Sequence, residues 1–197
     1  MKEDISKSLH LGAYSRGYLP TRDEPNRRQM VTFRLNDSLP KGVLIGWQEE
    51  MKLFPDEARD RKLREKVQTH LDAGYGTCLL GRPEAARIVA EAFKARDSHD
   101  YELLAWVVMP NHVHVLIRQV DGAPLHKIVS AWKGVTSHAI NKLLDRKGPL
   151  WNREYFDRYM RDDDHFARAV AYIEDNPVNA GLCRTPGEWI YSSAYRK

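Results

Sequence analysis

Two histidines two residues apart, His112 and His114, are the side chains whose type and spacing point most directly to chemistry. They lie in a run of Val, Leu and Ile that is typical of an extended strand. Side chains of a strand alternate between its faces, so both imidazoles point to one side, about 7 Å apart. This pair suits a shared divalent metal, although most metal sites need further ligands. Partly exposed histidines on an open sheet face are the other interpretation.

A second candidate set lies on a helix predicted over residues 162–176, where Tyr172 and Asn176 are four residues apart and share a face. A phenol is a weak nucleophile at neutral pH, but it can attack a phosphodiester when a metal polarises the phosphate. Two imidazoles and the Asn176 amide oxygen would make three ligands, and mixed nitrogen and oxygen ligation suits Mg²⁺ or Mn²⁺. An amphipathic surface helix on which the Tyr172 ring packs sideways remains the alternative.

Residues 124–161 are basic, with eight Lys or Arg against three Asp or Glu, and aromatic residues are interleaved with the cations. Cations bind phosphates and rings stack on bases, so this composition suits single-stranded or hairpin nucleic acid. Four residues of this stretch are predicted DNA contacts: Lys133, Arg153, Arg158 and Trp132. A solvated helix face over a tryptophan-containing core would have the same composition.

Hydrophobic periodicity predicts the elements that must position these side chains. The predicted strands span residues 30–35, 101–109 and 112–118, with a partly extended segment at 151–160. The predicted helices span residues 56–71, 83–94, 125–144 and 162–176, the last ending before Pro177. This order predicts an α+β domain in which helices pack on one face of an antiparallel or mixed sheet and the other face stays open. We expect residues 1–28 to form an irregular arm and 29–197 a single domain.

The composition of the 197 residues, 42% hydrophobic and 29% charged with a net charge of +4, is typical of a globular domain with a sizeable core. No apolar run approaches the roughly 20 residues of a membrane helix, and the polar N-terminus shows no signal peptide. Cys78 and Cys183 are far apart, which argues against a thiolate zinc site or a disulfide framework. The expected location is therefore the cytoplasm, without a membrane partner.

The ordered motifs of the chain, taken together, resemble a known family over nearly the whole sequence. They are Gly17–Pro20, Val31–Leu35, Ala105–His114, Trp132-Lys133, Tyr155–Arg158, Tyr172–Leu182, Trp189 and Ser192–Ala194. This set resembles the HUH superfamily of single-tyrosine transposases, which includes the IS200-like enzymes, and more narrowly the REP-associated tyrosine transposases of bacteria.

The resemblance implies a ferredoxin-like α+β fold with helices on one face of the sheet and the metal site on the other. It assigns His112 and His114 as the metal pair, Asn176 as a third ligand and Tyr172 as the nucleophile, with Mg²⁺ or Mn²⁺ as cofactor. It further implies binding of palindromic REP-type DNA hairpins. The adjacent single strand would be cleaved and rejoined through a 5′-phosphotyrosine and a free 3′-hydroxyl.

Three other functions remain open at this stage. The first is a hairpin-DNA-binding protein or repressor without cleavage in the cell. The second is a nucleotide hydrolase with a triple-histidine motif, although Leu116 stands where that motif needs a third histidine. The third is a replication initiator or relaxase, although such proteins usually place the tyrosine before the histidine strand. Tyr155 and Tyr159 are rival nucleophiles by residue type, and the sequence is compatible with both a monomer and a homodimer.

Overall fold

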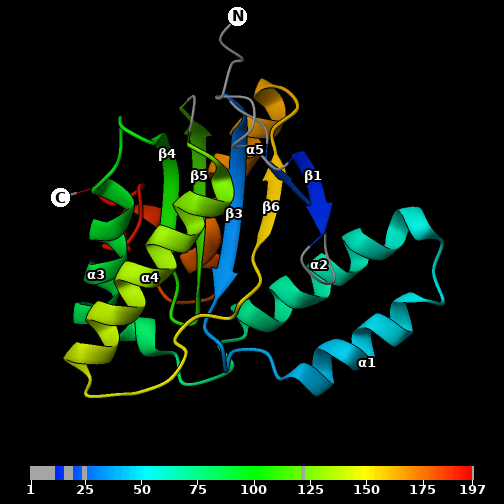
Figure 1. Cartoon of the computed structure of the whole chain (residues 1–197), viewed down its shortest axis with the longest axis horizontal. Coiled ribbons are helices and arrows are strands. Elements are labelled where there is room, and N and C mark those ends of the chain that lie inside the picture. Colours follow the sequence, from blue (N-terminus) through cyan, green and yellow to red (C-terminus); the bar gives the residue numbers. More distant parts are fainter. Residues whose placement is uncertain (1–11, 16–19, 24–25, 121–122, 197) are drawn as a thin grey trace, which may run out of the picture.

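A four-stranded antiparallel sheet forms the centre of the molecule (Figure 1). The structure, a computed structural model, describes residues 12–15, 20–23, 26–120 and 123–196. The spatial order is β4-β5-β3-β6, and the strands are β3 (Arg28–Arg34), β4 (Tyr101–Val108), β5 (His112–Gln119) and β6 (Phe156–Tyr159). Helices intervene between β3 and β4 and between β5 and β6, whereas β4 and β5 form a hairpin. This βαββαβ order with two central strands confirms the ferredoxin-like α+β fold.

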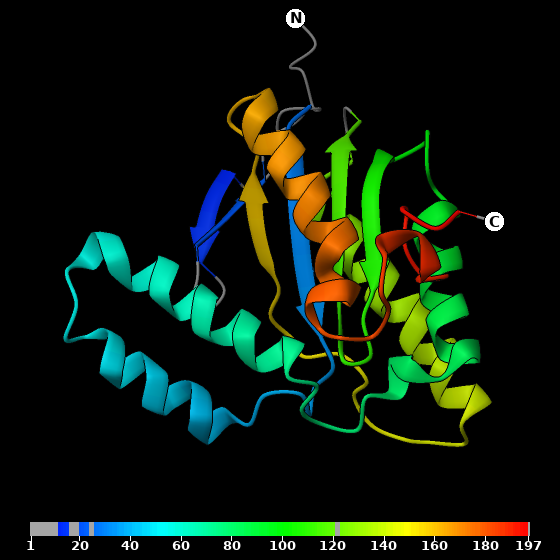
Figure 2. The same cartoon turned by 180° about the vertical axis from the view of Figure 1, so that it is seen from behind.

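Helices cover both faces of this sheet. α3 (Pro83–Lys94) and α4 (Leu125–Leu143) lie on one face, and α5 (Asp163–Asn179) lies across the other (Figures 1 and 2). α1 (Lys41–Met51) and α2 (Asp56–Asp72) form a helical hairpin that extends to the β6 side of the sheet. Two short 3-10 turns, Leu79–Gly81 and Pro186–Glu188, complete the described elements. No helix in the described part of the chain is long and apolar enough to cross a membrane.

The main apolar core lies between the sheet and the α3–α4 pair. Alternation along β5 turns Val113, Val115 and Ile117 toward this side, where they are buried. Phe33 of β3 lies at its centre and contacts the rings of Phe93, Trp132 and Trp151, with centroid distances of 6.3, 6.4 and 4.7 Å. This face of the sheet is therefore fixed by dense aromatic and aliphatic packing.

The opposite face of the sheet differs from our expectation, because it is covered rather than open. Leu116 of β5 packs there with Ala169 and Ile173, which form the apolar stripe of α5. His112 and His114 point to the same side as Leu116 and are both 0% exposed. A stripe of this kind needs a partner surface, and the apolar positions of the sheet supply it. The interpretation of the histidines as partly exposed residues on an open sheet face is therefore wrong.

Several element boundaries also differ from the sequence predictions. α5 continues through Pro177 to Asn179, since the hydrogen bond from Ala180 N to Asn176 O (3.0 Å) extends the helical turn beyond the proline. α1 was not predicted, because Gly42 and Gly46 weaken its helical pattern. Within the predicted arm, β1 (Gly12–Ser15) and β2 (Pro20–Asp23) pair as antiparallel strands, so the described part of the arm is not irregular. The motif residues 17–19 lie outside the described residues.

Candidate active site

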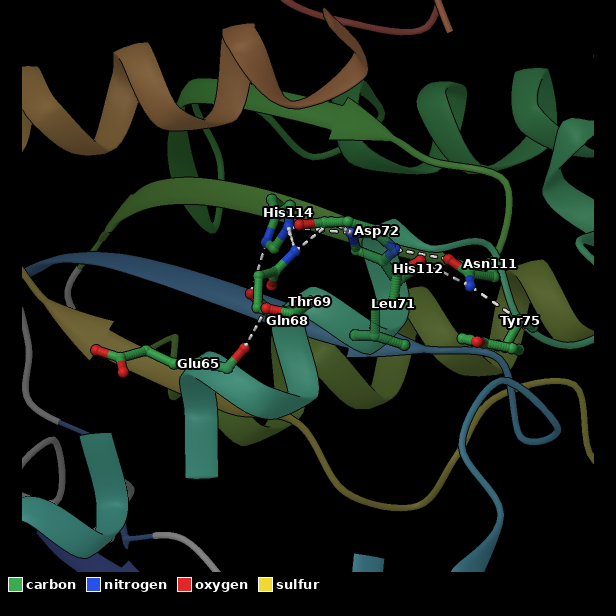
Figure 3. Close-up of polar contacts among 10 residues, drawn as sticks. Glu65, Gln68, Thr69, Leu71, Asp72, Tyr75, Asn111, His112 and His114 are labelled. Carbon is green, nitrogen blue, oxygen red and sulfur yellow. Dashed lines mark hydrogen bonds and ion pairs between the residues drawn. The ribbon is translucent and has the colours of Figure 1, made fainter. Parts of the chain in front are cut away.

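The imidazoles of His112 and His114 converge on one point of the buried sheet face. Their Nε2 atoms are 3.2 Å apart, and the two rings stand nearly perpendicular, at 81°. Figure 3 shows the pair beside the last turns of α2, which contribute Gln68 and Asp72. The strand directs both side chains to this face, and their outer nitrogens meet there.

Hydrogen bonds fix the orientation of the His112 imidazole. The Asn111 amide nitrogen donates to the carbonyl oxygens of Leu71 (3.0 Å) and Tyr75 (2.9 Å), so its Oδ1 faces His112 Nδ1 at 2.7 Å. Since Oδ1 only accepts, His112 carries its proton on Nδ1. The lone pair of Nε2 is then free to bind a ligand.

His114 presents its outer nitrogen in the same way. Its Nδ1 lies 2.7 Å from Thr32 Oγ1. The Gln68 amide nitrogen donates to Asp72 Oδ1 (2.6 Å) and lies 3.3 Å from His114 Nε2. In the tautomer in which Nδ1 donates to Thr32 Oγ1, Nε2 offers a lone pair toward Gln68 and His112. Two lone pairs directed at one point, with both Nδ1 atoms anchored behind them, form an arrangement that suits a shared cation.

Burial keeps both imidazoles neutral. It lowers the pKa of His114 to about 3, and burial followed by the neighbouring His114 lowers the pKa of His112 well below its ordinary value. Neutral imidazole is the form that binds metals. The pair therefore stays competent for ligation across the physiological pH range.

α5 brings Tyr172 and Asn176 to the histidines. The Tyr172 ring lies 5.3 Å from the His114 ring, centroid to centroid. Asn176 is 1% exposed and lies close to the side chains of Tyr172 and Asp72. Burial, followed by the charge of Asp72, raises the pKa of Tyr172 above its ordinary value. The structure thus brings together all four residues predicted as ligands or nucleophile.

The free oxygen of Asn176 is the observation that best fits a metal here. Asn176 Oδ1 is buried and has no hydrogen-bond partner among the described residues. Such an atom is destabilising unless a ligand satisfies it. Within the described part of the chain, no three His, Cys, Asp or Glu side chains form a metal-binding group, so the candidate donor set depends on this amide. Two imidazole nitrogens and one amide oxygen are compatible with Mg²⁺ or Mn²⁺.

Gln68 and Asp72 are site residues that the sequence analysis missed. Asp72 Oδ1 lies 3.6 Å from His112 Nε2, and burial raises the pKa of this carboxyl group. Their spacing of four residues places them on one helical face, next to the buried Val67 and Leu71. That spacing was a visible signal, but no local pattern indicates that α2 ends beside the histidine strand.

A cavity of about 630 Å³ leads to Tyr172 between α2, β6 and α5. Tyr172, Thr32 and Gln68 lie in its wall, together with the acidic residues Glu65, Asp157 and Asp162. Five arginines from these elements and the loop after β6 also line it: Arg61, Arg64, Arg158, Arg161 and Arg168. The five arginines make this part of the cavity basic. Burial, followed by the charges of Arg158, Arg161 and Arg168, lowers the pKa of His165, which also lines the cavity. An anionic ligand complements such a surface.

The four predicted DNA contacts have different environments. Arg158 lines the cavity, and Arg153 is exposed but lies outside it. The Lys133 ammonium donates to three backbone carbonyls, those of Asn152, Arg153 and Glu154, at 3.0–3.1 Å, which is a structural arrangement. Trp132 is 4% exposed in the apolar core, and its indole N–H donates to the Tyr101 hydroxyl (2.9 Å). The prediction of Trp132 as a stacking surface for DNA is therefore wrong.

The rival nucleophile Tyr155 belongs to the apolar core on the α3–α4 side. This places it across the sheet from the histidines. Among the three tyrosines considered, Tyr172 is the one in ring contact with the histidine pair.

Comparison with known proteins agrees with this arrangement. Residues 82–176 match the family described as "Transposase IS200 like". A protein assigned as a REP-associated tyrosine transposase of Haemophilus influenzae is 27% identical over 53% of this chain and 66% of its own length. The REP-associated tyrosine transposase of Escherichia coli is 23% identical over 52% of this chain and 60% of its own length. The matches thus span less than two thirds of these curated relatives.

A solved structure of a REP-associated tyrosine transposase bound to a REP hairpin has a similar fold. The TM-score is 0.56 at 17% identity, over 93% of this chain and 82% of that one. Residues 82–176, which match the model of the IS200-like transposase family, contain all four predicted ligand and nucleophile positions. The chain is also similar in sequence to REP-associated tyrosine transposases, which confirms the resemblance found in the sequence.

Proposed function

We propose that this protein is a metal-dependent single-strand DNA endonuclease and transposase that binds palindromic, REP-type hairpins. It cleaves and rejoins the adjacent strand through a 5′-phosphotyrosine. The observation that carries this proposal is the meeting of Tyr172 with the histidine pair at an arginine-lined cavity. A nucleophile, metal-binding nitrogens and a phosphate-binding surface are the three parts that such a reaction requires.

The metal would be held by His112, His114 and Asn176, whose outer nitrogens and free amide oxygen fit it. When bound, Mg²⁺ or Mn²⁺ would polarise the scissile phosphate and offset the negative charge that develops there. Asn111 and Thr32 hold the two imidazoles from behind, so the ligand nitrogens are already oriented before a cation binds.

Tyr172 is the group that would react with DNA. Its hydroxyl oxygen attacks the phosphorus, and the bond from phosphorus to the 3′-oxygen breaks. The phenol loses its proton, and the leaving 3′-oxygen gains a proton to become the 3′-hydroxyl. The products are a 5′-phosphotyrosine and a free 3′ end, which rejoins strands by the reverse attack. Because burial raises the pKa of Tyr172, the phenol is protonated in the free protein.

The cavity arginines would bind the strand that leads to Tyr172. None of the five forms an ion pair within 4.0 Å with a described carboxylate, and Arg64 Nε is buried without a hydrogen-bond partner there. Guanidinium groups of this kind complement phosphate oxygens. The REP hairpin bound to the protein of similar fold supports a hairpin as the attached duplex.

The test is a denaturing-gel assay with labelled single-stranded DNA carrying a palindromic hairpin from the genomic neighbourhood of the coding sequence. The parent protein with Mn²⁺ or Mg²⁺ is expected to give a covalent protein–DNA band that chelator abolishes. Tyr172→Phe should give none, whereas the control Tyr159→Phe should keep it. A covalent band from Tyr172→Phe, or tight hairpin binding by the parent without any covalent band, would contradict the cleavage proposal.

A further inference from the structure

Arg64 is the cavity residue whose environment points most directly to a ligand. It lies on α2 and lines the cavity that leads to Tyr172. Its Nε atom is buried and has no hydrogen-bond partner in the described part of the chain. A guanidinium group stays charged in proteins, and a buried donor without an acceptor is destabilising. An anionic acceptor inside the cavity would remove this penalty.

The nearby carboxylates of the protein do not supply that acceptor. The charges of Asp60 and Asp157 act on Arg64, but neither carboxylate hydrogen-bonds to its Nε atom. Burial, followed by the charge of Arg158, lowers the pKa of Arg64. Arg158 also lines the cavity, so two cations contribute to the same wall. A phosphate group offers the negative charge and the paired oxygens that a guanidinium fork binds best.

The position of Arg64 on α2 relates it to the histidine pair. Arg64 and Gln68 are four residues apart, share a face of the helix and both line the cavity. The Gln68 amide nitrogen lies 3.3 Å from His114 Nε2 (Figure 3). Along the helix axis, Arg64 is therefore about one turn, or roughly 5.4 Å, beyond the residue that contacts the histidines. This offset is comparable to the spacing of neighbouring phosphates in an extended single strand.

Tyr172 lies in the wall of the same cavity, on α5. A strand that presents one phosphate to Tyr172 and the histidine pair would therefore place a neighbouring phosphate in the cavity beside α2. α2 ends at Asp72, whereas the stretch that matches the transposase family begins at residue 82. A DNA contact on α2 would thus lie outside the part of the chain that the family model matches.

We propose that Arg64 forms a subsite for the phosphate adjacent to the scissile one, with its Nε atom donating to a phosphate oxygen. This inference rests on the proposed cleavage of a single strand by Tyr172. It assigns one contact to one phosphate, whereas a general attraction between the basic cavity and DNA would involve every phosphate of the strand alike.

The experiment combines variants of the protein with single neutral phosphates in the DNA. The cleavage gel of the parent identifies the scissile phosphate from the length of the labelled product. Hairpin DNA is then made with one methylphosphonate at that position or at one neighbouring position at a time. Fluorescence anisotropy in chelator, where no cleavage occurs, measures each affinity. The parent should lose about tenfold or more in affinity when one of the two adjacent phosphates is neutral.

Arg64→Ala should bind the unmodified DNA about tenfold more weakly, or worse, and should not distinguish it from DNA with that methylphosphonate. Arg64→Lys keeps the positive charge but has no donor in place of Nε, and it should also bind more weakly than the parent. The matched control Arg87→Ala removes the same charge from a side chain that is 68% exposed on α3, and it should retain parental affinity and sensitivity. Circular dichroism verifies that each variant is folded.

Three results would overturn the inference. The first is an Arg64→Ala protein that is as sensitive as the parent to neutral phosphates at both adjacent positions. The second is a dependence on Arg64 at the scissile phosphate or at a more distant one instead. The third is parental affinity in Arg64→Lys, which would assign the effect to charge alone.

Failure of the underlying proposal has a separate signature. A parent protein that gives no covalent band with hairpin DNA contradicts the cleavage function and, with it, this inference. A parent protein that cleaves the DNA while Arg64→Ala retains parental affinity contradicts only the phosphate subsite.

Discussion

The two faces of the central sheet use the same strands for opposite purposes. On the α3–α4 face, Trp151 Nε1 donates to Thr136 Oγ1 at 2.8 Å, and Lys133 donates to three carbonyls. On the α2–α5 face, Asn176 Oδ1 and Arg64 Nε are buried without a partner among the described residues. Buried polar atoms are normally satisfied, so these two atoms beside the histidine pair and the cavity suit a ligand. The α3–α4 face is thus packed as a core, whereas the α2–α5 face contains the candidate site.

The largest expected effect comes from neighbouring residues of β3 that point to opposite faces. Phe33→Ala removes a buried ring that contacts three other aromatic rings, and it should reduce the free energy of unfolding by about 3–5 kcal/mol. Thr32→Val keeps the side-chain volume but removes the hydroxyl beside His114 Nδ1. This change should reduce the free energy of unfolding by only about 1 kcal/mol. Urea unfolding of both variants measures this difference.

Metal binding should show the reverse order. Thr32→Val removes a support of a ligand, whereas Phe33→Ala leaves every donor atom in place. Folded Phe33→Ala protein at low temperature should therefore bind Mn²⁺ more tightly than Thr32→Val. Equal unfolding free energies for the two variants would mean that the faces do not divide stability from chemistry as described.

The sequence predicted the apolar side of this contrast more completely than the polar side. Alternation in β5 identified Val113 and Val115 as core residues and placed His112 and His114 on the opposite face. The apolar stripe of α3 predicted a helix over residues 83–94, which are the bounds that the structure shows. Local periodicity also placed Tyr172 and Asn176 on one face of α5. It could not reveal Gln68 and Asp72 as site residues, because their role depends on where α2 ends in space. Trp132 was misassigned because an aromatic side chain in a basic stretch suits both a core and a stacking surface.

The pH dependence of stability tests whether the polar face is as dry as the apolar one. Burial lowers the folded-state pKa of His114 from 6.5 to about 3, so below pH 6.5 protons bind the unfolded chain preferentially. The stabilising contribution is complete above pH 6.5 and is lost as the pH falls toward 3. With chelator present, lowering the pH from 7 to 5 should reduce the free energy of unfolding by about 2 kcal/mol through the titration of His114 alone. The titration of His112 acts in the same direction.

The matched variant for this measurement is His112→Gln/His114→Gln, which retains His70 and His165, whose pKa values are also lowered. Its unfolding free energy should fall less steeply between pH 7 and pH 5 than that of the parent. Parallel curves would show that the imidazoles are solvated, as on an open sheet face, and the contrast between a ligand-binding face and a closed core would have to be abandoned.

The smallest expected effect concerns single arginines on the two sides of the molecule. Arg158 lines the cavity on the α2–α5 side, whereas Arg87 of α3 is 68% exposed and lies 4.0 Å from Glu91. Each phosphate contact to a single strand contributes about 0.7 to the slope of log affinity against log salt concentration. Arg158→Ala should therefore weaken binding of hairpin DNA with a single-stranded extension and reduce the slope by about 0.7, with Arg87→Ala close to the parent.

Fluorescence anisotropy across a salt series measures both the affinity and the slope. Equal slope changes for the two variants would assign DNA binding to the general basic surface. A change confined to Arg158→Ala would place the strand in the cavity that leads to Tyr172, because the net charge lost is the same in both proteins.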